Sequence, residues 1–187
     1  MSYSLTTPST QALAYIEGAV YMVYQSTTPA VTGSSTPGQS PQFEGGYKLG
    51  FARYINGAWH DLGVVQEDDE HYASSESGPA LVAFKDVLYL AYRGMKPNDN
   101  AIMWATYSHK TGKWKLKGSL GGNDPIPSST APALSLAIDN DAPEPVILLT
   151  YKEGTGKDGP IRWSVYDGQS WAHMGEITIT PVTPGTA

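Results

Sequence analysis

The sequence predicts an all-β fold built from three copies of one four-stranded unit. The chain has 187 residues, including 20 Gly, 14 Pro and 12 Tyr, a composition typical of short strands joined by tight turns. The same succession of apolar segments and aromatic residues also occurs three times along the chain. A chain of this length can bury a core as one domain without disulfides, and it contains no cysteine.

The first two predicted strands of each unit are largely apolar on both faces. The first strand reads ALAYI at 12–16, ALVAF at 80–84 and ALSLAI at 133–138. The second strand always ends in tyrosine and reads AVYMVY at 19–24, VLYLAY at 87–92 and VILLTY at 146–151. We expect such strands to lie between two neighbouring layers, because both of their faces must be buried.

The third predicted strand carries an aromatic residue three positions before a closing tyrosine. It reads KLGFARY at 48–54, AIMWATY at 101–107 and PIRWSVY at 160–166. A turn and a tryptophan follow, and these tryptophans, Trp59, Trp114 and Trp171, are 55 and 57 residues apart. The fourth strand of the second unit, KWKLKGSL at 113–120, alternates lysine with other residues, as expected of an outer strand whose edge is protected by charge.

A repeated four-stranded unit predicts the blade of a β-propeller. We expect a single domain over residues 1–187, with blade 1 at about 5–66, blade 2 at about 74–121 and blade 3 at about 128–180. A closed propeller needs roughly four to eight blades. Three blades therefore predict either a homodimer that completes a ring of six blades, which we favour, or a longer repeat array. Residues 26–46, rich in Ser, Thr, Pro and Gly, are predicted to be a mobile loop.

Charge and composition disfavour several classes of partner. A net charge of −6 disfavours binding to nucleic acid or to anionic membranes. No apolar segment approaches the roughly 20 residues of a membrane helix, so no membrane insertion is expected. The N-terminal segment lacks the features of a signal peptide, which predicts a cytoplasmic protein or one released by a non-classical route.

No cofactor or metal site is predicted. The four histidines lack paired ligand spacing. The Asn/Asp clusters at 98–100 and 139–141 contain oxygen ligands that calcium accepts. Because such clusters between strands usually form turns, we interpret both as turns.

The motifs GPAL, LYLAYRG, IMWATY and GKW in the second unit, and APAL, LLTYKEG and IRWSVYDGQSW in the third, resemble the repeats of sialidase-like (BNR-type) β-propellers and of bacterial and fungal propeller lectins. The resemblance covers nearly the whole chain. It implies glycan binding at or between blades, by an aromatic platform with a cationic or amide side chain. The segment SVYDGQSW at 164–171 matches the sialidase Asp-box only in part, because its aspartate is one place late, and we interpret it as a hairpin turn.

The position after each second-strand tyrosine holds a long hydrogen-bond donor, and the third-strand aromatics are expected beside it. Sugars stack their C–H faces on aromatic rings and accept hydrogen bonds from such donors. We therefore predict shallow sugar sites formed by Tyr92, Arg93 and Trp104, by Tyr151, Lys152 and Trp163, and by Tyr24, Gln25 and Phe51. In the alternative interpretation the aromatics are blade core and the donors are solvated strand ends.

The leading functional hypothesis is a non-catalytic, lectin-like propeller whose partners are glycans. The first alternative is a non-catalytic protein-interaction module of a toxin or adhesin system. The second is a sialidase-like glycoside hydrolase, which is disfavoured because Arg53, Arg93 and Arg162 occupy different positions of the repeat. The sequence favours a binding protein over an enzyme without deciding between them, and we assign no catalytic residue.

Overall fold

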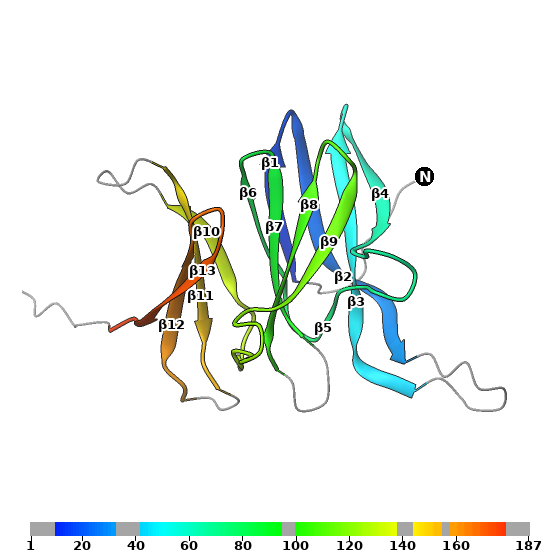
Figure 1. The fold of residues 1–187 in the computed structure, drawn as a ribbon. Coiled ribbons are helices and arrows are strands. Elements are labelled where there is room, and N and C mark those ends of the chain that lie inside the picture. The colour runs from blue at the N-terminus through cyan, green and yellow to red at the C-terminus, as the bar shows by residue number, and fades with distance from the viewer. Residues whose placement is uncertain (1–9, 33–41, 95–99, 138–143, 155–157, 179–187) are drawn as a thin grey trace, which may run out of the picture.

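The computed structural model describes residues 10–32, 42–94, 100–137, 144–154 and 158–178, and the regular elements among them are strands (Figure 1). These strands form three antiparallel sheets, here called blades 1, 2 and 3. The predicted all-β fold with three four-stranded antiparallel blades per chain is confirmed. Among these residues there is no helix of the length and apolarity that a membrane crossing requires.

Each blade runs through its strands in chain order. Blade 1 contains β1 (Gln11–Ile16), β2 (Ala19–Thr32), β3 (Gln42–Ile55) and β4 (Ala58–Val64), with β5 (Ser74–Ser75) paired to β3. Blade 2 contains β6 (Ala80–Phe84), β7 (Val87–Arg93), β8 (Ile102–Ser108) and β9 (Lys113–Ser119). Blade 3 contains β10 (Ala133–Ala137), β11 (Val146–Lys152), β12 (Ile161–Tyr166) and β13 (Trp171–Glu176).

Part of the predicted loop at 26–46 is instead strand. β2 continues to Thr32 and β3 begins at Gln42, so the two strands extend beyond the repeat unit. The part of the predicted loop that belongs to β2 contains Thr27, Thr28 and Val31, and these β-branched residues favour extended backbone. Residues 33–41 lie outside the described residues. The predicted turns at 98–100 and 139–141 also lie outside them, except for Asn100.

Tight turns join the first strands of blades 1 and 2 to their second strands. Glu17 and Gly18 between β1 and β2 both have positive φ, as do Lys85 and Asp86 between β6 and β7. Two consecutive positive φ values are the geometry of a type I′ turn, whose twist matches that of the paired strands. Asn56 and Gly57 form the same kind of turn between β3 and β4, at the position where the sequence reads Asn-Gly.

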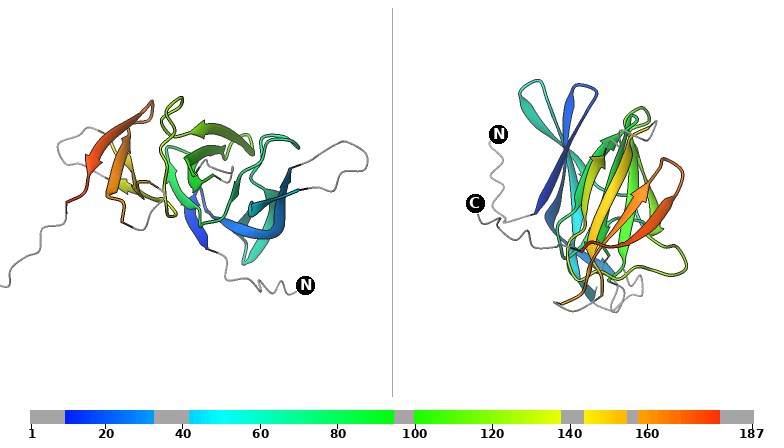
Figure 2. Two further views of the ribbon diagram at one scale, coloured as in Figure 1. Left: turned by 90° about the horizontal axis from the view of Figure 1, so that it is seen from below. Right: turned by 90° about the vertical axis from the view of Figure 1, so that its left-hand side faces the viewer.

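The first strands of neighbouring blades lie against each other, β1 against β6 and β6 against β10, whereas the fourth strands lie at the opposite edges of the sheets (Figure 2). In β9, Lys113, Lys115 and Trp114 alternate between exposed and buried, as predicted for an outer strand. Blade 2 therefore lies between blades 1 and 3, and each junction buries the faces of two sheets.

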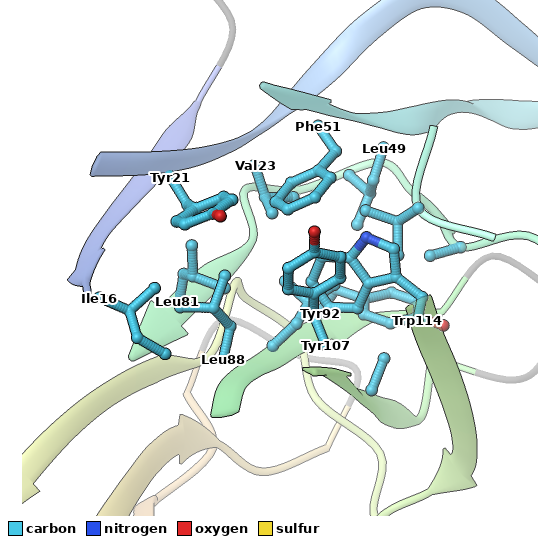
Figure 3. Packing of buried hydrophobic residues seen from close by; sticks show 14 of the residues in the cluster. Ile16, Tyr21, Val23, Leu49, Phe51, Leu81, Leu88, Tyr92, Tyr107 and Trp114 are labelled. Carbon is cyan, nitrogen blue, oxygen red and sulfur yellow. The ribbon is translucent and has the colours of Figure 1, made fainter. Parts of the chain in front are cut away.

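Aromatic side chains fill both junctions in the same way. Between blades 1 and 2, Phe51 contacts Tyr107 and Trp114, with ring centroids 4.8 and 5.0 Å apart (Figure 3). Between blades 2 and 3, Trp104 contacts Tyr166 and Trp171 at 5.6 and 5.9 Å. The third-strand aromatic of one blade thus packs on the closing tyrosine and the tryptophan of the next.

Two buried serines fix the entries to blades 2 and 3. The Ser75 hydroxyl donates to the Arg93 carbonyl at 2.7 Å, and the Ser128 hydroxyl donates to the Lys152 carbonyl at 3.0 Å. Both serines are fully buried. Each hydroxyl ties the segment that precedes a blade's first strand to the end of its second strand.

Candidate functional site

An open cleft lies between blades 2 and 3, with a volume of about 420 Å³. One wall is the connection from β9 to β10, and the other is the blade 3 sheet. The cleft is lined by Gly121, Asp124, Pro125, Ile126, Pro127, Tyr151, Glu153 and His173. A volume in this range accommodates a small ligand such as a single sugar ring.

Tyr151 and His173 form a hydrogen-bonded pair on the wall from blade 3. The Tyr151 hydroxyl lies 2.8 Å from His173 Nδ1, and the Ser164 hydroxyl lies 3.4 Å from the same nitrogen. Register explains the meeting, because Ser164 pairs with His173 across β12 and β13. Burial is the main cause that raises the pKa of Tyr151 above its ordinary value.

Glu153 and Arg162 form an ion pair beside that tyrosine. Arg162 Nε donates to the Glu153 carboxylate at 2.8 Å, and Arg162 Nη1 lies 4.0 Å from the Glu176 carboxylate. The hydrogen bond to Glu153 is the largest cause that raises the pKa of Arg162. Arg162 is the cross-strand partner of Tyr151, so both side chains lie on the face of blade 3 that turns toward blade 2.

The wall formed by the connection from β9 to β10 is apolar at residues 125–127, and backbone hydrogen bonds hold it at both ends. Ile102 N donates to the Ile126 carbonyl at 3.0 Å on blade 2, and Gly154 N donates to the Pro127 carbonyl at 3.1 Å on blade 3. Gly121 has a φ of +90°, and a Cβ there would collide with the Asp124 carbonyl. Only glycine fits this tight turn, which brings Pro125, Ile126 and Pro127 to the cleft.

The lining groups have the chemistry that suits a neutral, hydroxyl-rich ligand. The carboxylates of Asp124 and Glu153 accept hydrogen bonds, and a phenol can donate or accept them, while isoleucine and proline supply apolar contact. Within the described part of the chain, no three His, Asp or Glu side chains gather as they would around a metal ion.

The equivalent position between blades 1 and 2 is closed and apolar. Burial of the second-strand tyrosine does not distinguish the two junctions, because Tyr92 is 4% exposed and its equivalent Tyr151 is 2% exposed; the difference lies in their neighbours. Gly94 and Leu116 stand where blade 3 has Glu153 and His173. The connection from β4 to β6 fills the remaining space, since Val65 and Ala73 are fully buried and hydrogen bond to Leu49 of blade 1 or to each other. The polar cleft is thus not repeated at this junction.

The structure places the predicted residues of blades 1 and 2 in several environments. Phe51 is buried at the junction of blades 1 and 2, and Trp104 packs at the junction of blades 2 and 3. The Gln25 amide donates to the Ser75 carbonyl at 3.2 Å. Arg93 lies 3.6 Å from the Glu76 carboxylate and hydrogen bonds to Asn100. Because Tyr92 and Arg93 are consecutive strand residues, they point to opposite faces of blade 2.

Blade 3 separates its three predicted residues in the same way. Tyr151 faces the cleft, whereas Lys152 and Trp163 lie on the opposite face, because Trp163 is paired with Thr150. Tyr24 lies on the face of blade 1 that turns away from blade 2, and its ring leaves no room for a Cβ at Gly50. One predicted residue, Tyr151, therefore lines the cleft.

Sequence reasoning missed Glu153, Arg162 and His173. Their common feature is that they share the face of Tyr151: Arg162 is its strand partner, Glu153 follows it by two residues, and His173 pairs with Ser164 on the same face. A search for polar residues at the positions opposite the second-strand tyrosine would have found Arg162. The partial Asp-box has a local role instead, because the Asp167 carboxylate accepts hydrogen bonds from the backbone of Gln169 and Ser170 at 2.7 and 2.8 Å.

No protein-family model matches the chain, and no curated protein matches it with significance. Among solved structures, it is similar to a fucose-specific lectin from Aleuria aurantia, at 14% identity and a TM-score of 0.55, over 90% of this chain and 49% of that one. It is also similar to an α-L-arabinofuranosidase from Clostridium thermocellum, at 18% identity and a TM-score of 0.49, over 89% of this chain and 56% of that one.

The likeness is one of fold. The chain spans about half the length of the lectin that it resembles. The similarity supports a propeller architecture like that of the lectin, whereas repeats of the sialidase type stay a prediction.

Proposed function

We propose that the protein is a non-catalytic, lectin-like propeller that binds carbohydrate in the cleft between blades 2 and 3. The observation that carries the proposal is that one open cleft is lined both by the Tyr151–His173 pair and by Glu153, whose carboxylate is held by Arg162 beside the cleft. Hydrogen-bonding groups on one wall suit the hydroxyls of a sugar, and apolar residues on the other suit its C–H face.

L-Fucose is the first ligand to test. The fold resembles that of a fucose-specific lectin. The methyl group of this sugar would contact Ile126 and the neighbouring prolines, while its hydroxyls would bond to Glu153 and reach Arg162 beside it. The ion pair holds the carboxylate and the guanidinium in fixed positions before the ligand arrives, which reduces the entropy lost on binding.

The sequence predicts repeated shallow sites, and we propose one such cleft per chain at the blade 2–3 junction. A single cleft favours an assembly in which several chains act together, because two weak sites on one particle bind a glycan-covered surface far better than one. A homodimer provides two such sites.

A titration with free sugars tests the proposal. The 187-residue chain is screened on a glycan array and then titrated by calorimetry with L-fucose and a panel of other monosaccharides. We expect saturable binding to at least one sugar. Arg162→Ala should weaken that binding at least tenfold, because it removes a donor and releases Glu153 from its fixed position.

Lys152→Ala is the matched control, because this cation follows Tyr151 but lies on the opposite face of blade 3. We expect it to bind sugar like the unmodified protein. The proposal is wrong if no sugar binds, or if Lys152→Ala loses binding while Arg162→Ala keeps it. Release of reducing sugar from a glycoside would replace it with the hydrolase alternative, for which Asp124 and Glu153 supply two carboxylates in the cleft.

A further inference from the structure

The outward face of blade 1 exposes aromatic residues that are buried at the equivalent positions of blade 2. Tyr54 and Trp59 are 39% and 43% exposed, whereas their equivalents Tyr107 and Trp114 are each 7% exposed. In blade 2 these rings are covered by Phe51 of the preceding blade. Nothing in the described residues covers them in blade 1. Leu13 on the same face is 55% exposed.

The exposed pair already has the geometry of a finished junction. The ring centroids of Tyr54 and Trp59 are 5.3 Å apart, with an interplanar angle of 54°. The buried pairs are closely similar: Tyr107–Trp114 at 5.2 Å and 47°, and Tyr166–Trp171 at 5.1 Å and 39°. Blade 1 therefore presents a preformed surface for the third-strand aromatic of another blade.

The outward face of blade 3 presents that aromatic. Trp163 occupies the repeat position of Phe51 and Trp104, the two residues that pack on such pairs inside the chain. It shares its face with Thr150 and Leu148, away from Tyr151 and blade 2. The outward faces of blades 1 and 3, here called the two end faces, thus carry the two halves of one junction. The complete contact, a third-strand aromatic on a Tyr–Trp pair, occurs twice within the chain.

The two end faces cannot meet within one chain, because blade 2 lies between blades 1 and 3 (Figure 1). We propose that they bind a second copy of this chain head to tail, with Trp163 of each copy on the Tyr54–Trp59 pair of the other. Two such junctions close a ring in which every blade has a neighbour on both faces. This association does not depend on sugar binding, because the cleft at Tyr151 lies within one chain.

Sedimentation or light scattering over a concentration series tests the assembly. We expect a particle with twice the mass of one chain, and a mass that stays constant as concentration rises. Trp59→Lys and Trp163→Lys each place a cation in both junctions, and each should raise the dissociation constant at least about thirtyfold, as expected for a central aromatic contact. Circular dichroism checks that both variants keep the fold.

Leu136→Lys is the matched control. Leu136 is 43% exposed, but it pairs with Ile147 on the face of blade 3 that turns toward blade 2. The substitution adds the same charge at an exposed apolar position outside the proposed junctions. It should leave the dissociation constant unchanged.

Mixing the two tryptophan variants tests the head-to-tail geometry. A mixture of Trp59→Lys and Trp163→Lys keeps one intact junction, formed by the unchanged face of each chain, so we expect pairs of one variant with the other. A chain that stays monomeric at every concentration would overturn the proposal. So would a mass that grows without limit, a dimer of either variant as tight as that of the unmodified protein, or a mixture that fails to pair.

Discussion

Phe51 of blade 1 meets Trp114 of blade 2 edge-on, with ring centroids 5.0 Å apart and an interplanar angle of 75°. Trp104 and Trp171 meet in the same way at the next junction, at 5.9 Å and 85°. Edge-to-face packing of this kind stabilises a pair beyond the burial of its apolar area. The same aromatic contact therefore helps to join each blade to the next.

Phe51→Ala should lower the free energy of unfolding by about 3–5 kcal/mol, the usual cost of removing a buried aromatic ring. Phe51 is 2% exposed. Tyr15→Ala is the comparison, because Tyr15 is 67% exposed and its removal should cost less than about 1 kcal/mol in the single chain. Urea unfolding at low protein concentration measures both. Equal losses would show that the aromatic junction does not hold the blades together.

Ser128→Ala should destabilise the protein by about 0.5–1.5 kcal/mol, because it removes a buried hydroxyl that hydrogen bonds to the Thr130 and Lys152 carbonyls, while the Lys152 carbonyl keeps the Ser129 backbone N–H as a donor. Ser75→Ala should cost a similar amount for the same reason at Arg93. Ser170→Ala is the control, since Ser170 is exposed and uses its backbone in the Asp167 turn. The midpoint of urea unfolding reports all three. An unchanged unfolding midpoint in Ser128→Ala would contradict the structural role of this hydroxyl.

Stability should fall as the pH rises between about 10 and 12. Burial, with a smaller contribution from Tyr166, raises the pKa of Tyr89 to about 12. An unfolded tyrosine ionises near pH 10. Above that pH the unfolded state releases a proton that the folded state retains, so stability that is complete below pH 10 is lost as the pH approaches 12.

Tyr89→Phe tests this alkaline effect, because phenylalanine cannot ionise. Urea unfolding at about pH 8 and at several values between about pH 10 and 12 should show a smaller loss of stability in the variant. The burial of Tyr92 acts in the same direction, so part of the alkaline loss should persist. Parallel pH profiles for the variant and the unmodified protein would rule out Tyr89 as a source of the effect.

Tyr151→Phe should weaken sugar binding about tenfold while leaving the fold unchanged. The variant keeps the ring but removes the hydroxyl that lies 2.8 Å from His173 Nδ1, and one lost hydrogen bond corresponds to about 1.4 kcal/mol. Tyr92→Phe removes the equivalent hydroxyl at the closed junction and should not affect binding. Calorimetry measures the sugar affinity of both variants. A larger loss of affinity in Tyr92→Phe would indicate that the site lies at the junction of blades 1 and 2, contrary to the proposal.

The sequence predicted the strands because apolar runs, turn residues and the repeated Tyr and Trp positions are local signals. It did not predict the cleft. Tyr151 and Lys152 are neighbours in the chain but lie on opposite faces of β11, so a motif of consecutive residues splits across the sheet. Arg162 lies beside Tyr151 because the two are strand partners. That register depends on turns and bulges and not on a motif of residues adjacent in the chain.

The packing between blades could not be predicted from the sequence either. The two junctions share their aromatic residues, yet one is closed by Val65 and Ala73 and the other is open beside Pro125 and Pro127. The lengths and sequences of these connections differ, and their positions are fixed by contacts with blades far along the chain. The repeat alone therefore suggested equivalent junctions, whereas the two junctions of the structure differ.

A crystal structure of the protein with a bound monosaccharide tests the central claim most directly. The account predicts electron density for the sugar in the cleft, with hydroxyls within hydrogen-bond distance of Glu153 and Arg162 and its C–H face toward Ile126. Density on the opposite face of blade 3, beside Lys152 and Trp163, would contradict the account.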